Sequence, residues 1–181
     1  VTLRDSMDFN TILMTINLTV TEAGSGSSGS TSGGNTSTGS GSTSTNDYSA
    51  IRDEIVRLTN AVRKENGVAE LSTNNALMGA AQAAAECYAE AGIWNGHDDE
   101  MERQCMQDAG LSYSFNVNLT RFSKNYTGQV ANTAVSNWKN SSGHFQTMTY
   151  SSYELLGVGV AVDASGNYWC VQFFADPKYN I

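Results

Sequence analysis

Two apolar segments in the last third of the chain limit its fold more than any other feature. Residues 155–162 and 168–175 are apolar at nearly every position, and Gly166 lies in the turn between them. A strand with one face in water alternates apolar and polar residues, whereas these segments leave no polar face. The pair therefore predicts an antiparallel hairpin that is covered on both faces by other elements.

Helical patterns upstream of the hairpin can supply those covering layers. They lie in residues 48–66, 74–91, 98–109 and 128–140. The first repeats apolar residues at helical spacing, and the second is rich in alanine, which lets a helix approach a sheet closely. Weak alternation in residues 114–122 predicts a further short strand. We therefore expect an α/β fold, a three-layer α-β-α sandwich, in a domain spanning residues 47–181.

The first 46 residues have a different character. Apolar and polar side chains alternate within residues 11–21, which predicts one isolated β-strand in the segment 1–23. A single strand needs partners, so we interpret it as the end of an upstream β domain. Self-association through a second copy of this strand, or pairing with the sheet edge of the next domain, stays open as an alternative. Residues 24–46 are almost wholly Gly, Ser, Thr and Asn, the composition of a flexible linker.

Charge and hydropathy exclude several classes of partner. The net charge is -8 and the isoelectric point is about 4.6. Nucleic acids and anionic membranes select basic surfaces, so neither is expected to bind. The sequence contains no apolar run long enough to span a bilayer. It starts at Val1 without a basic and apolar leader, which is typical of a piece of a longer or processed product.

Three cysteines and two histidines are the residues with the most reactive chemistry. Cys87 and Cys105 fall on predicted helices that flank one loop, so the sequence allows a disulfide between them and equally allows buried thiols. His97 lies in that loop, and His144 follows a Ser-Ser-Gly break just before the hairpin. A lone histidine is more often a packing residue than a ligand, so each needs a partner to become functional.

Seven segments resemble, in the same order, the CAP superfamily, which comprises cysteine-rich secretory proteins, antigen 5 and pathogenesis-related 1 proteins and bacterial SCP-like extracellular domains. They are Leu58-Thr59-Asn60-Ala61-Val62-Arg63, the alanine-rich residues 71–85, Gly96-His97, Asn116-Val117-Asn118-Leu119, Trp138 with Ser142-Gly143-His144-Phe145, residues 156–161 with Gly157 and Gly159, and residues 168–174. The resemblance covers roughly residues 51–175 and is closest to bacterial-type members. It implies the same α-β-α sandwich, with a central cavity.

In that family two histidines and two acidic residues line the cavity, and many members bind a divalent metal such as zinc through the histidines. The resemblance places the histidines at His97 and His144. The carboxylates do not carry over, because Val117 stands at one acidic position and the other, near Ser141, also holds no acid. The predicted cavity-lining residues are Val117, Asn118, Ser142 and Tyr150.

Two imidazoles alone make an open and weak metal site. Water or one of the acids at positions 98–100 would have to complete it, and the sequence shows no acid that orients the imidazoles. We therefore expect a secreted or surface-displayed module that binds a protein, lipid or sterol, with zinc or another divalent metal held weakly. A metal-assisted, protease-like hydrolase using the His97 and His144 cavity is the alternative. An enzyme is the less expected outcome, because no nucleophile motif is present.

Overall fold

The computed structural model describes residues 48–123 and 129–180. Its elements are α1 (Ser49–Glu65), α2 (Asn75–Ala91), α3 (Asp99–Asp108), β1 (Tyr113–Ser123), α4 (Val130–Lys139), α5 (Ser142–Met148), β2 (Leu155–Val162) and β3 (Asn167–Asn180). The isolated strand and the linker expected in residues 1–46 lie outside the described residues, so both stay predictions.

The three strands form one antiparallel sheet in the order β1-β3-β2. Strand β3 is central: Val171 pairs with Leu119 of β1 on one side and with Gly159 of β2 on the other. The predicted hairpin is the β2–β3 pair, which turns at Gly166 with a positive φ of 80°. Strand β1 is an edge strand of this sheet, and the candidate site described below is built around it.

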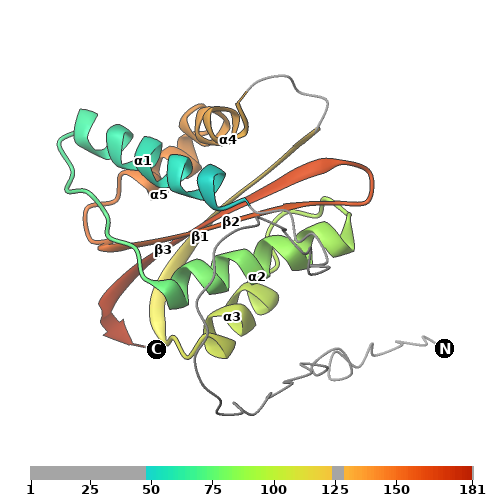
Figure 1. The fold of residues 1–181 in the computed structure, drawn as a ribbon. Coiled ribbons are helices and arrows are strands. Elements are labelled where there is room, and N and C mark those ends of the chain that lie inside the picture. Colours follow the sequence, from blue (N-terminus) through green and yellow to red (C-terminus); the bar gives the residue numbers. More distant parts are fainter. Residues whose placement is uncertain (1–47, 124–128, 181) are drawn as a thin grey trace, which may run out of the picture. The chain divides into compact units, whose positions relative to one another are not determined.

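Helices cover both faces of the sheet, which confirms the predicted α-β-α sandwich. Figure 1 shows α1, α4 and α5 on one side of the strands and α2 with α3 on the other. Successive side chains of β3 alternate between the two layers, as strand geometry requires. Trp169, Val171 and Phe173 pack into the core under α2 and α3, whereas Cys170 and Phe174 pack into the core under α1 and α4. This double burial explains the unbroken apolar pattern of the hairpin.

Strand β2 divides its two faces by size rather than by polarity. Leu156, Val158 and Val160 fill the core on the α1 side. Gly157 and Gly159 face α2, and a Cβ atom built on Gly159 would lie 1.9 Å from the carbonyl oxygen of Ala81. The two glycines therefore let the backbone of α2 pack directly against the strand.

A buried arginine ties α1 to the segment before β2. Arg63 is fully buried, and its guanidinium donates hydrogen bonds to four backbone carbonyls. The acceptors are Ala69 O at 2.7 Å, Met148 O at 2.8 Å, Tyr150 O at 3.0 Å and Tyr153 O at 3.4 Å. Burial lowers the pKa of Arg63 from its ordinary value. The carbonyl dipoles thus solvate a charge that water cannot reach, and they fix the path of residues 148–153.

One element departs from the sequence prediction. The Ser-Ser-Gly segment does end α4, but Ser142 immediately begins α5, so His144 lies inside a short helix rather than after a helix end. The side-chain amide of Asn118 on β1 donates to the carbonyl oxygen of His144 at 3.1 Å. This long-range contact helps to fix a seven-residue helix that has no strong local signal.

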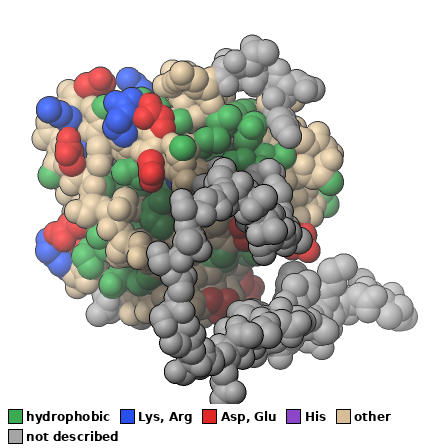
Figure 2. Space-filling view, in the orientation of Figure 1, with side chains coloured by type: hydrophobic (Ala, Val, Ile, Leu, Met, Phe, Trp, Pro, Cys, Tyr) green, Lys and Arg blue, Asp and Glu red, His purple; other side chains and the backbone are tan. Residues whose placement is uncertain are grey.

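The surface in Figure 2 mixes hydrophobic side chains with charges of both signs. Basic side chains of the described residues often lie beside acids, as in the Arg57–Glu54 pair at 2.7 Å and the Lys139–Glu65 pair at 3.6 Å. Within the described part of the chain, no helix combines the length and the apolar character that a membrane crossing needs.

Candidate functional site

The two histidines come from opposite helical layers and lie close together. His97 follows Gly96, which has a φ of 83°, in the loop between α2 and α3. His144 lies on α5, in the other layer. Their ring centroids are 6.5 Å apart, with 60° between the ring planes. The sandwich thus brings together two residues that are distant in the sequence.

The loop that carries His97 is anchored on the core by aromatic contacts. Trp94 packs against Trp169 with ring centroids 5.7 Å apart, although Trp94 stays 49% exposed. Tyr88 of α2 also stacks on Trp169, with nearly parallel rings whose centroids are 5.8 Å apart. Because Trp169 is fully buried on the central strand, the loop is positioned relative to the sheet itself.

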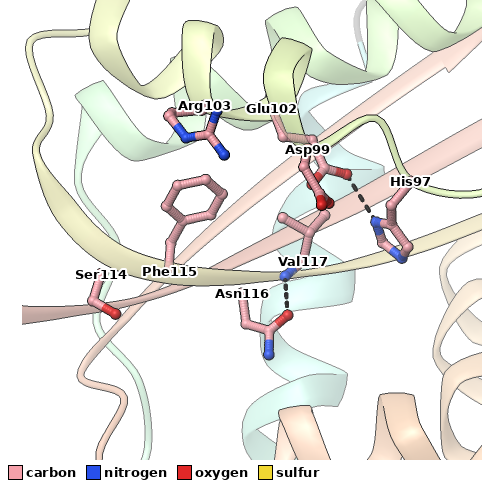
Figure 3. Close-up of a pocket in the computed structure, with 8 residues that line it drawn as sticks. All are labelled: His97, Asp99, Glu102, Arg103, Ser114, Phe115, Asn116 and Val117. Atoms are coloured by element: carbon pink, nitrogen blue, oxygen red, sulfur yellow. Dashed lines mark hydrogen bonds and ion pairs between the residues drawn. The ribbon is translucent and has the colours of Figure 1, made fainter. Parts of the chain in front are cut away.

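A buried carboxylate orients the imidazole of His97. Glu102, in the first turn of α3, is 3% exposed, and its Oε1 lies 2.8 Å from His97 Nδ1. The hydroxyl of Tyr88 donates to the same Oε1 at 2.7 Å and accepts from the backbone N–H of Asp98 at 2.8 Å. A carboxylate accepts hydrogen bonds, so Nδ1 carries the proton and Nε2 of the neutral ring keeps its lone pair. Figure 3 shows this contact at the rim of a cavity.

The expectation that no acid orients the imidazoles is therefore wrong. Glu102 was overlooked because three acids in the first turn of α3 are explained by the helix dipole alone. The available signal was its place one turn into a helix capped by Asp98, directly after the His97 loop. Asp98 itself accepts from the backbone N–H of Met101 as the helix cap.

The electrostatics of the two imidazoles differ. The hydrogen bond with Glu102 raises the pKa of His97, against an opposing effect of burial, and the charges of Glu102 and Asp99 add to the increase. Burial lowers the pKa of His144, and the neighbouring His97 lowers it further. As the pH falls, His97 therefore takes up a proton before His144. The imidazole of His144 stays neutral, with a lone pair available to a metal, over a wider pH range.

Replacing Glu102 with glutamine is expected to lower the pKa of His97, because the amide removes both the charge and the carboxylate acceptor. NMR titration of the metal-free protein measures it, and Glu100→Gln on the same helical turn is the control. The folded pKa of His97 is raised, so the stability from this pair is complete below the unfolded value of 6.5 and is lost as the pH rises through the folded pKa. An unaltered His97 titration in E102Q would contradict the assignment.

Beside His97, a cavity of about 390 Å³ opens over β1. Six of its eight lining residues are polar or charged, and the full set is His97, Asp99, Glu102, Arg103, Ser114, Phe115, Asn116 and Val117. In Figure 3 the residues of β1 form one wall and those of α3 the other. A second cavity of about 570 Å³ shares Ser114 and Asn116 with the first. It is completed by Gln146, Thr147, Tyr150, Ser152, Tyr153 and Asp176. The two cavities are thus adjacent along β1.

The residues predicted to line the cavity are distributed over this region. Val117 lines the first cavity, and Tyr150 lines the second and is 51% exposed. Asn118 is fully buried beneath α5, where its amide donates to His144 O and lies 3.2 Å from Gln172 Oε1. Ser142 is exposed at the start of α5 and is not among the residues that line either cavity. Sequence reasoning missed Arg103 as a lining residue, because it looks like an ordinary surface position of a helix, whereas Asp99 is one of the acids at positions 98–100 considered as a further metal ligand.

Within residues 48–123 and 129–180, no three His, Cys, Asp or Glu side chains come together as a metal site. The two imidazoles are therefore the candidate protein ligands. Glu102 is not a ligand in this arrangement, but it orients the ring of His97 through the contact with Nδ1. Such a set fits a weakly held divalent ion that completes its coordination with water or with a ligand.

Comparison with known proteins places this geometry in context. The model of the cysteine-rich secretory protein family (CAP) matches residues 56–174. A search of the curated proteins finds no match to the sequence.

Three solved structures show the same fold at low sequence identity. An extracellular SCP-domain protein of Bacillus anthracis is 19% identical with a TM-score of 0.57, and the match covers 70% of this chain and 40% of that protein. An outer surface protein of Borrelia burgdorferi is 16% identical with a TM-score of 0.58, over 72% and 95% of the two chains. The protein NaASP2, crystallised with Zn²⁺, is 11% identical with a TM-score of 0.53, over 70% and 79%. The chain thus spans less than half of the Bacillus protein.

Proposed function

This chain belongs to the cysteine-rich secretory protein family, and on that premise we propose that it is an extracellular or surface-displayed binding domain whose His97 and His144 hold a divalent metal weakly. The observation that carries the proposal is the 6.5 Å separation of two imidazoles, one of them oriented by a buried carboxylate. An extracellular setting is supported by the Bacillus and Borrelia proteins, which are described as extracellular and outer-surface proteins.

The donor set supports zinc as the metal, in a weak site. Neutral imidazole is a preferred zinc ligand, and the bond from Nδ1 of His97 to Glu102 leaves Nε2 available. Two protein ligands leave positions for water or for a donor atom of a ligand. When bound there, zinc would act as a Lewis acid that accepts a lone pair from an oxygen or nitrogen of that ligand. The crystal form of NaASP2 with Zn²⁺ adds support from a protein of the same fold.

The adjoining surface favours a polar ligand, such as a segment of a partner protein. The first cavity offers a carboxylate in Asp99, a guanidinium cation in Arg103 and neutral hydrogen-bonding groups in Ser114 and Asn116. The second adds hydroxyl and amide groups around the exposed ring of Tyr150. A lipid or sterol needs a largely apolar pocket. For this site we therefore place a protein or peptide ahead of the lipid and sterol ligands that the family resemblance also allows.

Metal-assisted hydrolysis is the weaker candidate for the same residues. A hydrolase needs a group that takes a proton from water or a nucleophile. Oε1 of Glu102 already accepts hydrogen bonds from Tyr88 and His97, and the residue is buried. Among the described residues that line the cavity, Asp99 is the remaining carboxylate. The geometry thus gives Glu102 an orienting role rather than that of a base.

Zinc binding tests the proposal directly. Calorimetric titration of the metal-free protein with zinc is expected to show one weak site, which His97→Ala and His144→Ala each abolish. Glu102→Gln should weaken it by about 10- to 100-fold, the usual effect of removing a group that orients a ligand. Arg103→Ala, a change to the cavity wall, is the control and should keep the wild-type affinity. Zinc affinity that survives both histidine substitutions would overturn the proposal.

A further inference from the structure

The second cavity beside β1 has a buried carboxylate in its lining. Of the described residues that line this cavity of about 570 Å³, Asp176 alone carries a charge. It is 5% exposed, and its Oδ1 accepts a hydrogen bond from the backbone N–H of Lys178 at 2.9 Å. The ion pairs formed within residues 48–123 and 129–180 do not include Asp176. Burying a carboxylate is costly unless a cation pairs with it, so the cavity favours a positively charged ligand.

The strand register places Asp176 on the side of the sheet that carries the segment between α5 and β2. Side chains two residues apart on a strand share a face, so Asp176 lies on the same face as Phe174. The ring of Phe174 contacts that of Tyr153, with centroids 5.8 Å apart. On β1, Ser114 pairs with Asp176 and Asn116 with Phe174, and both of these β1 residues line the cavity. The acid and the segment around Tyr153 therefore meet at one cavity.

Two tyrosines of that segment line the same cavity. The rings of Tyr150 and Tyr153 have centroids 5.1 Å apart with 61° between their planes, and Tyr150 is 51% exposed. The backbone carbonyls of both tyrosines accept hydrogen bonds from the buried Arg63, which fixes the path of the chain here. The face of an aromatic ring is negative and attracts cations. An exposed ring and a buried carboxylate in one cavity thus both favour the same charge.

We propose that the second cavity is a subsite for an arginine side chain of a bound peptide, with Asp176 as the counter-ion and the ring of Tyr150 stacked on the guanidinium. The subsite rests on the peptide-binding function proposed above, but it does not need a metal at the histidines. A guanidinium carries five N–H donors in one plane and stacks on aromatic faces, whereas an ammonium is a compact point charge. Side-chain oxygens of Ser114, Gln146 and Ser152 in the same lining can accept the donors that the carboxylate leaves over.

Three capped tripeptides that differ in the central residue test the subsite: Gly-Arg-Gly, Gly-Lys-Gly, and a Gly-citrulline-Gly peptide in which a neutral urea replaces the guanidinium. Each is titrated into the metal-free full chain and followed by NMR. The arginine peptide should bind at least about 10-fold more tightly than the citrulline peptide, because a hydrogen bond between charged groups is stronger than a neutral one. The lysine peptide should bind several-fold more weakly than the arginine peptide, since it lacks the planar fork of donors.

Variants of the lining assign the preference to its residues. Asp176→Asn should lower the affinity for the arginine peptide to that for the citrulline peptide, and thermal unfolding shows whether this buried change keeps the fold. The exposed Tyr150 gives a second test: Tyr150→Ala should weaken the arginine peptide several-fold, whereas Tyr150→Phe keeps the ring and most of the affinity. Asp53→Asn, which changes an exposed acid on α1, is the matched control and should bind all three peptides as the wild type does.

The outcomes separate this subsite from the proposed metal site. Because the peptides are titrated without metal, an arginine preference would stand even if zinc failed to bind at the histidines. Equal affinities for the arginine and citrulline peptides would overturn the subsite even if zinc binds as proposed. An arginine preference that survives both Asp176→Asn and Tyr150→Ala would overturn it as well.

Discussion

Replacing Gly159 with alanine is expected to destabilise the domain by more than about 3 kcal/mol, beyond the usual range for an overfilled core. The added Cβ atom would lie 1.9 Å from Ala81 O and 2.4 Å from the carbonyl carbon of Ala81. Backbone atoms cannot rotate away as a side-chain end can, so α2 would have to move off the sheet. The unfolding midpoint in urea, followed by circular dichroism, measures the loss.

Gly79 offers a matched control on the helix that Gly159 meets. It lies inside α2, and a Cβ atom built there meets nothing within 4 Å. Gly79→Ala is expected to stabilise the domain by about 0.5 to 1 kcal/mol, because alanine is the better helix former. If Gly159→Ala stabilises the domain as Gly79→Ala does, then Gly159 is not required for the close packing of α2 on β2.

Removing the guanidinium of Arg63 is also expected to lower the free energy of unfolding strongly. Arg63→Met keeps much of the apolar stem but leaves four backbone carbonyls without their donor, including those of Met148 and Tyr150. Unpaired buried acceptors cost about 1 to 3 kcal/mol each before relaxation, so a total loss above about 3 kcal/mol is expected. Arg63→Lys should recover only part of it, since one ammonium cannot replace a planar fork of donors. Thermal unfolding of both variants measures the loss.

Arg57 on the same helix is the control for this change. Its side chain is 64% exposed and pairs with Glu54 across one helical turn. Arg57→Met should move the melting temperature by about a degree at most, as is usual for exposed ion pairs. Equal melting temperatures for R63M and R57M would show that the carbonyl contacts of Arg63 contribute little to stability.

The sequence predicted the three layers of this fold, but it did not predict the order of the strands within the sheet. Periodicity located the main helices and the hairpin, because burial on one or two faces leaves a direct mark on residue type. It could not show that β3 is the central strand, since pairing with β1 depends on long-range contacts and not on local pattern. The role of Gly157 and Gly159 was equally hidden, because it concerns a helix about eighty residues earlier in the chain.

The candidate site shows the same limit. The histidines were marked out by their rarity and by the family resemblance, and the structure places their rings 6.5 Å apart. Glu102 and Tyr88 were missed, because an acid in a first helical turn and an aromatic on a buried helix face both have ordinary explanations. Only the packing of α2 on α3 brings the carboxylate, the phenol and the imidazole into one chain of hydrogen bonds.

The central place of β3 governs when the domain can fold. Neither β1 nor β2 has a strand partner other than β3 in the described sheet, and β3 is the last of the three to leave the ribosome. Until β3 emerges, β1 and β2 lack their strand partner, and the apolar faces of the helices have no complete sheet to pack against. Such long-range pairing is slow, and it leaves the growing chain extended and open to chaperones during synthesis.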